Sequence, residues 1–445
     1  MQVSIAAAGT ALEPATAALL QRMLCPLTGL AQEIGFAQRG RLEPRIAVSG
    51  GDMTGVHVLR GKHAPREGAY HIGGSGLTYG EVVIRTLGET IERYVQFAPD
   101  KPRHFLVATL EELLAEERTV AVTDPLRFFS EAQLGRDGFP FSAVSDETRI
   151  GWVAAPSAFD GTECWVPAQQ ALVGYVPADG EPQYVAGVTT GTAAHTDLAK
   201  AARNALLEVV QIDAAVGHWY GAMDAIALGR DARTRALDDL VARQLEPGGP
   251  IPRFYLLPSP DLPGFAVACV LESAELPRIA VGLGCDLQLT RAMYKAFLEG
   301  AAVAQLAKVN LFRQATSGSI AGSADTDGIY DLDTNVAYYA VHLEAEALTD
   351  RFGNRQPVSP TELPADSDGS VDEDLSTLIA AFRKSGKRLV LFDLSTNDIR
   401  ELGFRVVRVW SPDVLPLPLP STPMVEHPRF LAYGGVTHEA PHPYP

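Results

Sequence analysis

The sequence predicts a mixed α/β protein, and three features point to this class. The chain has 445 residues, of which 46% are hydrophobic and 8% aromatic, enough apolar material for a large buried core. Short runs of β-branched and aromatic residues, bounded by Gly and Pro, are typical of strands. Three Gly-rich segments each lead into an amphipathic helix, at residues 73–97, 187–221 and 282–300. Strands and helices therefore alternate along the chain.

The predicted elements follow in order. Residues 1–65 combine a helix near 19–24 with a strand-like stretch at 46–58, and we expect this N-terminal segment to pack on a main domain at 66–445. Segment 105–114 begins as a strand or a helix, and further strands are predicted at 162–176, 253–259, 264–273, 278–284, 388–394 and 404–410. Helices are predicted at 375–385 and 397–402. An acidic linker is predicted at 352–374 and a proline-rich tail at 411–445.

The charge balance excludes two classes of partner. Acidic residues outnumber basic ones by 54 to 37, a formal net charge of −17. Nucleic-acid binding relies on Lys and Arg, and anionic membranes repel an acidic surface, so we expect neither partner. The sequence has no apolar run long enough to span a bilayer, no signal peptide and no CxxC pair among its four cysteines. We therefore expect a soluble, cytoplasmic protein with reduced thiols.

Polar residues recur at helical spacing on the three amphipathic helices. The stripes are Arg85, Glu89, Glu92 and Gln96 on the first helix, Asn204, Glu208 and Gln211 on the second, and Arg291, Lys295 and Glu299 on the third. The second helix is otherwise rich in Ala, Leu and Val, too apolar for a solvent-facing helix. Its few polar residues are therefore expected to face a shared cavity.

These stripes have two interpretations. They can be solvated faces with ion pairs such as Arg85–Glu89 and Lys295–Glu299. The repetition on three helices, each after a Gly-rich segment, favours carboxylates that converge on Mg²⁺. Such ions would let an acidic protein bind the phosphates of ATP. No Walker A loop, dinucleotide fingerprint, GxSxG or HExxH motif is present, so a nucleotide cradle would be of a non-Walker type.

The motifs together resemble those of the YcaO family. GGSGLTYGEVVIRTLGETIERY (73–94) resembles the family's first signature, a Gly-rich turn and a helix ending Glu-x-x-Glu-Arg. Segment 189–219 resembles the second signature, with Glu208 and Asp213 in matching places. Segment 282–300 resembles the third, an Ala-rich helix that carries Glu299. The resemblance covers about residues 65–445 and implies a YcaO-type fold of mixed sheets and helices around ATP.

The resemblance implies the site residues. Mg²⁺ is expected at Glu89, Glu92 and Glu208. Nucleotide contacts are expected from Ser75, Gly76, Thr78, Arg85, Arg93, Thr190, Asn204, Gln211, Arg291, Lys295 and Glu299. Gln211 stands in place of a glutamate of the second signature. Three further departures from the family's pattern are Ser75, where a lysine is frequent, Ile212, which replaces an arginine, and Gln305, which lies farther from Glu299 than the family's glutamine.

The last five residues distinguish classes within the family. They read Pro441-His442-Pro443-Tyr444-Pro445, a PxPxP ending. In an arbitrary protein such an ending is a solvated polyproline tail. In the YcaO family it resembles the azoline-forming cyclodehydratases, where the tail enters the active site. The resemblance implies that the Pro445 carboxylate lies beside the reacting peptide, positioned by Pro441 and Pro443.

The resulting hypothesis is an ATP- and Mg²⁺-dependent cyclodehydratase that converts Cys, Ser or Thr of a ribosomal precursor peptide to a thiazoline or oxazoline. The resemblance also implies two partners, a leader-binding protein similar to ubiquitin-activating enzymes and a flavin-dependent azoline dehydrogenase. Two alternatives stay open: thioamide or amidine formation by the same amide activation, and a non-catalytic docking scaffold of a peptide-modifying complex.

Overall fold

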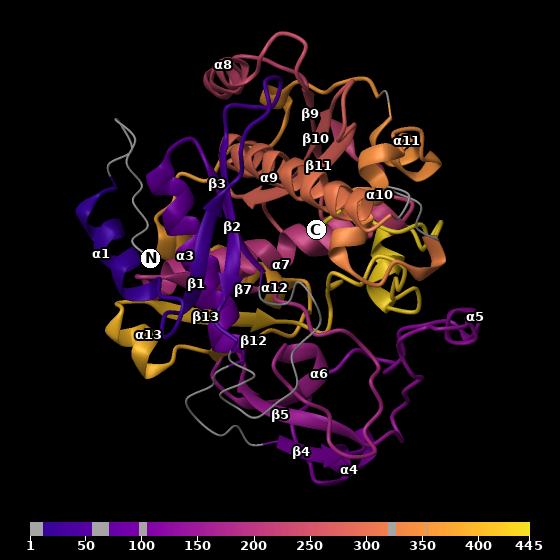
Figure 1. Cartoon of the computed structure of the whole chain (residues 1–445). Helices are drawn as coiled ribbons and strands as arrows, with labels where there is room; N and C mark the ends of the chain where they lie inside the picture. Colours follow the sequence, from indigo (N-terminus) through magenta and orange to yellow (C-terminus); the bar gives the residue numbers. More distant parts are fainter. Residues whose placement is uncertain (1–11, 56–70, 98–104, 319–325, 354) are drawn as a thin grey trace.

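The fold is described from a computed structural model that covers residues 12–55, 71–97, 105–318, 326–353 and 355–445. Within these residues the strands form four small antiparallel sheets, and helices lie between and around them (Figure 1). The predicted mixed α/β class is confirmed. None of the helices in the described ranges is both long and apolar enough to cross a membrane.

The N-terminal sheet has the order β1-β2-β3 and carries one long helix. Its elements are α1 (Pro14–Met23), β1 (Ala31–Phe36), β2 (Ala47–Met53), β3 (His71–Gly76) and α3 (Tyr79–Phe97). The strand predicted at 46–58 contains β2, and its last residues lie outside the described ranges. Val82, Val83, Leu87, Ile91 and Val95 form the buried face of α3.

The next sheet, β4-β5-β6, lies at one end of the molecule (Figure 1). Its elements are β4 (Phe105–Ala108), α4 (Leu110–Ala115), α5 (Glu131–Leu134), β5 (Ile150–Pro156), β6 (Glu163–Pro167) and α6 (Ala168–Ala171). The strand predicted at 162–176 is therefore only partly correct. It ends at Pro167 because the following Ala-Gln-Gln-Ala has no β-branched residue and forms one helical turn.

The third sheet, β12-β13-β7, joins distant parts of the sequence. Its elements and the helices beside it are β7 (Thr192–His195), α7 (Leu198–Tyr220), α12 (Val371–Lys384), β12 (Val390–Asp393), α13 (Asn397–Glu401) and β13 (Arg405–Trp410). The segment predicted as an acidic linker packs on the protein before α12 begins. In it, Val358 bridges to Leu228, and Asp366 accepts a hydrogen bond from Leu289 N at 2.7 Å. The domain boundaries themselves stay a prediction.

The fourth sheet has the order β11-β10-β9-β8 and supports the longest helix. The elements of this part are β8 (Ile226–Ala227), α8 (Arg235–Gln244), β9 (Ile251–Leu256), β10 (Phe265–Glu272), β11 (Ile279–Asp286), α9 (Leu289–Thr316), α10 (Leu332–Val341) and α11 (Glu346–Phe352). Short 3-10 turns are formed by Thr326–Gly328, Pro360–Glu362 and Pro428–Tyr433.

Two of the three Gly-rich segments lie in strands; the turn expected at the first is wrong, and the third falls in the strand predicted at 278–284. Gly73–Gly76 belongs to β3, and Gly282 and Gly284 belong to β11. A Cβ at Gly74 would overlap with Thr86 of α3, and one at Gly282 would overlap with the backbone nitrogen of Gly300 in α9. Glycine is therefore required because each helix lies directly against the strand that precedes it. Only the second segment turns, at Gly191, whose φ is +82°.

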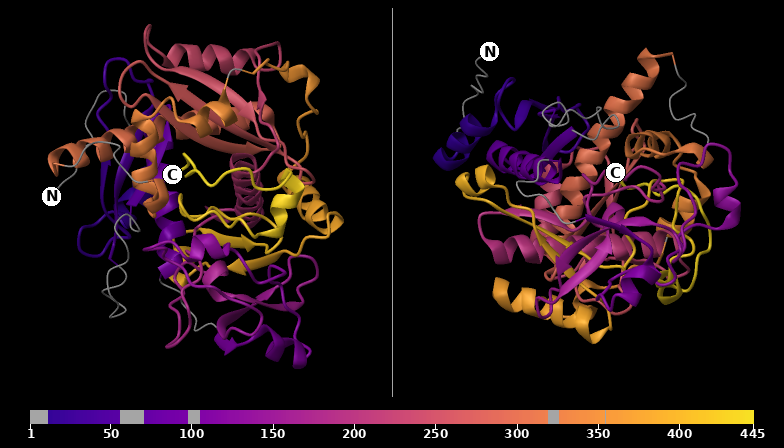
Figure 2. Two further views of the ribbon diagram at one scale, coloured as in Figure 1. Left: turned by 90° about the vertical axis from the view of Figure 1, so that its right-hand side faces the viewer. Right: turned by 90° about the horizontal axis from the view of Figure 1, so that it is seen from below.

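Helix α7 lies in the middle of the molecule. It contacts β13 on one side and β10 and β11 on the other, so it is enclosed between the third and fourth sheets (Figures 1 and 2). Most of its residues are buried and share one hydrophobic core with both sheets. This position explains the unusually apolar sequence of the helix.

The proline-rich C-terminal segment is packed into the protein. It follows β13 and returns to the centre, where the chain end lies beside α7 and α9 (Figures 1 and 2). His442 and Tyr444 are almost completely buried, at 0% and 1% exposure. In this structure the tail is therefore not a solvated polyproline chain.

A buried ion pair holds this C-terminal segment on α7. Arg429 lies 2.6 Å from Asp213 of α7 and 2.8 Å from Asp261, and Asp213 is fully buried. Asp213 also accepts hydrogen bonds from the Tyr433 hydroxyl and the Leu415 backbone nitrogen, both at 2.9 Å. All these donors come from the C-terminal segment, so the charge on α7 is compensated only when that segment is in place.

Replacing Arg429 by Met should therefore be strongly destabilising. The substitution leaves the Asp213 carboxylate buried without its cation, which typically costs about 3–5 kcal/mol. The measurement is the free energy of unfolding in urea. Arg149→Met is the control, because Arg149 forms an exposed pair with Glu112 at 2.6 Å and such pairs contribute about 0–1 kcal/mol. Equal losses of stability in the two variants would contradict the structural role of the buried pair.

Candidate active site

Four carboxylates from three helices face one another in the centre of the protein. Glu89 and Glu92 come from α3, Glu208 from α7 and Glu299 from α9. All four side chains are only partly exposed, and their charges act on one another: Glu92 with Glu89 and Glu208, and Glu208 with Glu89 and Glu299. We call Glu89, Glu92, Glu208 and Glu299 the carboxylate cluster. Helical stripes from three distant segments are thus brought to one place.

Each carboxylate of the cluster is fixed by a backbone group. Gly73 N donates to Glu89 at 2.7 Å, and Gly191 N donates to Glu208 at 3.2 Å. Glu92 reaches across to β7 and accepts from Ala194 N at 2.7 Å.

Glu299 accepts a bond from the backbone of Leu283 in β11. Except for Glu92, each glutamate therefore binds the strand or turn that leads into its own helix. This arrangement orders the carboxylates without neutralising them.

Burial raises the pKa values of Glu92, Glu208 and Glu299, so these three carboxylates are hard to ionise. It raises the pKa of Glu208 to about 8; the Gly191 bond and Arg408 oppose the rise, while Glu299 and Glu89 add to it. Burial likewise raises the pKa of Glu299 to about 7, against the bond from Leu283 and with a further rise from Glu89. The pKa of Glu92 lies well above its usual value, mainly through burial. Desolvation and like charges thus act in the same direction.

Two arginines lie next to the cluster. Arg93 donates to Glu89 at 2.8 Å along α3. Arg408 of β13 is 1% exposed, donates to the Thr192 hydroxyl at 3.0 Å, and its charge acts on Glu208. Sequence reasoning missed Arg408, although an arginine inside the apolar strand RVVRVW was an available signal. The segment lies about 200 residues after Glu208, and only the fold brings the two together.

The other predicted nucleotide residues fall into two groups. Ser75 is buried in β3, Gly76 ends that strand, and the Thr78 hydroxyl accepts from Glu81 N at 3.2 Å at the start of α3. Thr190 precedes the turn that binds Glu208, and Asn204 and Gln211 are half-buried on α7 beside it. These six residues surround the cluster or lie on the elements that form it.

Two of the predicted basic residues have other partners, and a third is exposed. Arg85 donates to Glu81 at 2.8 Å rather than to Glu89. Lys295 pairs with Asp286 at 2.8 Å rather than with Glu299. Arg291 is exposed on α9. The two i,i+4 pairs suggested by the spacing are therefore not formed, which leaves Glu89 and Glu299 to the cluster. Asp213, one turn after Glu208, belongs to the ion pair with Arg429 and not to the cluster.

The carboxylate cluster fits Mg²⁺ shared with phosphate oxygens. Its donors are carboxylate oxygens, and a cation would relieve both the repulsion and the raised pKa values. Across the described part of the chain, no group of three or more His, Cys, Asp or Glu side chains could hold a metal ion by itself. This agrees with the chemistry of Mg²⁺, which is usually held by one or two carboxylates plus substrate phosphates and water.

The tail approaches the cluster along α7. The Trp219 indole donates to Ala440 O at 2.9 Å, and the Tyr444 hydroxyl donates to Ala215 O at 3.4 Å. The tail therefore runs against the direction of α7, toward Glu208. Ala215 and Glu208 are seven residues apart, about 10 Å along the helix. Pro441 and Pro443 are buried, and Pro445 is partly exposed.

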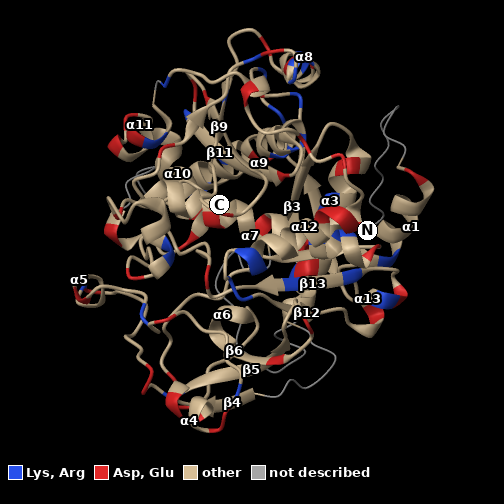
Figure 3. Cartoon of the chain, turned by 180° about the vertical axis from the view of Figure 1, so that it is seen from behind, with Lys and Arg blue, Asp and Glu red and all other residues tan. Residues whose placement is uncertain are grey.

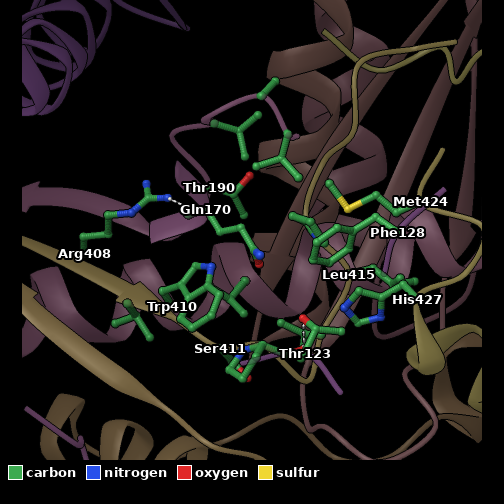
Figure 4. Close-up of a pocket in the computed structure, with 18 residues that line it drawn as sticks. Thr123, Phe128, Gln170, Thr190, Arg408, Trp410, Ser411, Leu415, Met424 and His427 are labelled. Atoms are coloured by element: carbon green, nitrogen blue, oxygen red, sulfur yellow. Dashed lines mark hydrogen bonds between the residues drawn. The ribbon is translucent and has the colours of Figure 1, made fainter. Parts of the chain in front are cut away.

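A small cavity lies between α7 and β13, where Val209 and Arg408 are among its lining residues. Its volume is about 40 Å³, room for a small group or a few waters. Figure 4 shows Phe128, Trp410, Leu415 and Met424 around it, with Thr190 on the same wall as Gln170 and Arg408. The apolar walls exclude water from one side of Arg408, which strengthens the electrostatic interactions of its guanidinium group.

Many of the other acidic residues lie on the surface of the protein. Figure 3 shows acidic positions on peripheral helices such as α4, α11 and α13, in addition to those on α3. Several of them form exposed ion pairs, for example Glu112 with Arg149 and Asp393 with Arg400. The cluster therefore differs from these exposed acidic residues by its partial burial and its convergence.

Comparison with protein families identifies the domain. Residues 73–415, most of the chain, match a family model described as YcaO cyclodehydratase, ATP- and Mg²⁺-binding. The description names the two cofactors that the sequence predicted. All four residues of the carboxylate cluster lie within the matched range. A comparison with curated proteins found no match.

Solved structures have the same fold at low sequence identity. A heterocyclase in complex with substrate and cofactor has a TM-score of 0.69 and 18% identity, over 96% of this chain and 57% of that chain. YcaO from Methanopyrus kandleri, bound with AMPPCP and Mg²⁺, has a TM-score of 0.56 and 17% identity over 86% of each chain. A chain of the E. coli microcin synthetase McbBCD complex has a TM-score of 0.60 and 13% identity, over 94% of this chain and 98% of that chain. This chain thus spans little more than half the length of the first of these proteins.

The raised pKa values predict an unusual pH dependence of stability without metal. A carboxyl whose folded pKa is raised stabilises the folded state below about pH 4.5, and this contribution is lost as the pH rises through 7 and 8. When a chelator removes divalent cations, the protein should therefore lose stability as the pH rises from 5 to 8. Glu208→Gln cannot ionise and should recover on the order of 1–3 kcal/mol at pH 8.

The measurement is thermal unfolding across this pH range, with the exposed Glu111→Gln as control. Added Mg²⁺ should restore stability at pH 8 more in the unchanged protein than in Glu208→Gln. Parallel pH curves for the unchanged protein and Glu208→Gln would contradict the electrostatic description of the cluster.

Proposed function

The chain belongs to the YcaO family, and on this premise we propose that it is an ATP- and Mg²⁺-dependent cyclodehydratase of ribosomally made peptides. One observation carries the proposal: the buried tail packs along α7, the helix that supplies Glu208 to the carboxylate cluster, and is directed toward Glu208. This arrangement supports a base beside a metal–phosphate site.

The reaction forms one ring and consumes one ATP. A Cys, Ser or Thr side chain of the substrate attacks the preceding backbone carbonyl carbon and loses its proton. The carbonyl oxygen takes the γ-phosphoryl group of ATP and leaves as phosphate, and the amide nitrogen loses its proton as the C=N bond forms. The product is a thiazoline or oxazoline. Bound Mg²⁺ would offset the negative charge of the phosphoryl group during its transfer.

The cluster residues supply the fixed negative charge that such ions require. Glu89, Glu92 and Glu208 would each lend one carboxylate to an ion, and Glu299 lies beside Glu208 as a further acceptor. Arg93 and Arg408 are placed to bind phosphate oxygens at the edge of the cluster. Their neighbours Thr192 and Glu89 orient both guanidinium groups before a ligand arrives.

The tail is proposed to supply the base. In a protein that ends at Pro445, its carboxylate is the tail's only acidic group after Glu439. Pro441 and Pro443 restrict the backbone, so little entropy is lost when the tail is held in the site. A carboxylate acts as a base when the proton lies within hydrogen-bond reach.

Separate proteins are proposed to bind the precursor peptide and to oxidise the rings after they form. Support comes from fold neighbours that work in a complex: one is the McbBCD microcin synthetase with pro-MccB17 bound. We infer a leader-binding partner similar to ubiquitin-activating enzymes, and a flavin-dependent dehydrogenase that oxidises azolines to azoles. The cytoplasmic location stays a prediction.

Mass spectrometry of a co-expressed precursor peptide tests the reaction class. Loss of one water per modified residue is expected, and each ring formed in vitro should consume one ATP. Replacement of an oxygen by sulfur would identify thioamide formation instead. No change in the peptide, with no peptide-dependent ATP consumption, would favour a docking scaffold and overturn the enzyme proposal.

Substitution of a cluster carboxylate should abolish turnover. Glu92→Gln keeps the hydrogen bond from Ala194 but removes a charge, and loss of several kcal/mol of metal-assisted stabilisation corresponds to a fall of about 10²–10⁴ in kcat. Peptide-dependent phosphate release is the measurement.

The control for this variant is Glu81→Gln, on the same helix. Glu81 is half-buried, as Glu92 is, but pairs with Arg85 outside the cluster. An unchanged kcat in Glu92→Gln would argue against a metal role for the cluster.

Extension of the chain beyond Pro445 should also suppress turnover. Even a few added residues remove the carboxylate from its position, so ring formation should fall strongly, while ATP binding stays close to that of the unchanged protein. Nucleotide affinity by calorimetry and ring formation by mass spectrometry measure the two effects separately. Full activity of the extended chain would exclude the tail as the base.

A further inference from the structure

The tail, defined here as Ala440–Pro445, is held by side chains that bind its carbonyl groups. Trp219 of α7 donates to Ala440 O at 2.9 Å, and the Tyr339 hydroxyl of α10 donates to Pro441 O. Asn335 of α10 donates from Nδ2 to His442 O at 2.8 Å and to Tyr444 O at 2.7 Å. Helices α7 and α10 thus donate hydrogen bonds to four of the tail's six carbonyl groups.

Asn335 binds the tail nearest to its end. Its side chain is completely buried, and it lies one helical turn before Tyr339, so both residues project from the same face of α10. Both of its partners are carbonyl oxygens, which can only accept. The amide nitrogen must therefore face the tail, and the orientation of the side chain is fixed by chemistry.

Asn335 is an unfavourable residue at this position if only the stability of the fold is considered. Its Oδ1 is buried and has no hydrogen-bond partner among the described residues. Asparagine is also a poor helix former, and a buried unsatisfied acceptor typically destabilises a protein. An apolar residue such as Leu would suit the core between α9 and α10 better. A buried polar group that is only half satisfied calls for a functional explanation.

We propose that Asn335 is the positioning residue that sets the register of the tail along α7, and so the place of Pro445 relative to the carboxylate cluster. The proposal rests on the proposed role of the tail in cyclodehydration. A shift of an extended polyproline-like chain by one residue moves its end by about 3 Å, which is enough to break a hydrogen-bond contact. Because Asn335 binds two carbonyls two residues apart, any such shift breaks both bonds.

Neighbouring groups support the fixed register. His442 donates from its ring to Pro418 O at 2.9 Å, and its other ring nitrogen accepts from Tyr444 N at 3.2 Å. The rings of His442 and Tyr444 stack with centroids 5.5 Å apart, and Trp219 lies edge-on to Tyr444. These contacts stiffen the tail, whereas Asn335 and Tyr339 connect it to α10.

The test compares Asn335→Leu with Asn310→Leu in the full chain. Asn310 is also buried and donates to a backbone carbonyl, Asp333 O at 3.3 Å, but on α9 and away from the tail. In Asn335→Leu, kcat for ring formation should fall about tenfold to a hundredfold, as expected for two lost hydrogen bonds, with an unchanged KM for ATP and an unchanged melting temperature. Asn310→Leu should keep its kcat.

A second measurement does not depend on activity. Hydrogen exchange at the backbone amides of Ala440, His442 and Tyr444 should be faster in Asn335→Leu than in the unchanged protein, and unaltered in Asn310→Leu. If the unchanged protein forms no rings, the proposed function fails, and exchange alone decides the role of Asn335. Equal exchange in the two variants, or a parallel loss of kcat and thermal stability, would overturn the proposal.

Discussion

The structure depends on four partly buried carboxylates, from three helices, that face one another with little positive charge around them: Glu89, Glu92, Glu208 and Glu299. Burial raises the pKa values of Glu92, Glu208 and Glu299, and the charge of Glu89 adds to each rise. Backbone N–H groups of β3, β7 and the turn at Gly191 compensate part of this negative charge. To donate these bonds the strands must lie against the helices, which requires glycine at positions such as Gly74 and Gly282. The glycine-rich segments thus serve helix packing rather than a phosphate loop.

Helix α7 links the carboxylate cluster to the C-terminal segment. Glu208 belongs to the carboxylate cluster, Asp213 one turn later anchors Arg429, and Ala215 and Trp219 contact the tail. Glu208, Ala215 and Trp219 follow one another at i, i+7 and i+11, on one face of α7, whereas Asp213 lies on another face. The helix itself is enclosed between two sheets. The position of the tail is therefore tied to that of the cluster through the geometry of α7.

Much of the fold and of the cluster follows from local sequence patterns. The strands at 264–273, 278–284 and 404–410 and the first two amphipathic helices are predicted within a few residues, since their periodicity is set by burial on one face. The third helix, α9, continues to Thr316, well beyond the predicted end at 300. The stripes also identify the four glutamates. Ion-pair partners are not predictable in this way: Arg85 pairs with Glu81 and Lys295 with Asp286, because nearby backbone places these acids within reach. Arg408, Arg429 and Asn335 were missed, because their roles depend on contacts across a hundred residues or more.

The hydrogen bonds from backbone amides to the glutamates also allow the charge state of the site to be followed by NMR spectroscopy. The amide protons of Gly73, Ala194 and Gly191 point at three different carboxylates, on Glu89, Glu92 and Glu208. The shift of an amide proton responds to the charge of the oxygen it meets. Three resolved resonances, two of them in the sparse glycine region of a nitrogen–proton spectrum, would thus report protonation or cation uptake at each glutamate separately. The same hydrogen bonds that order the site provide one natural reporter for each of these three glutamates.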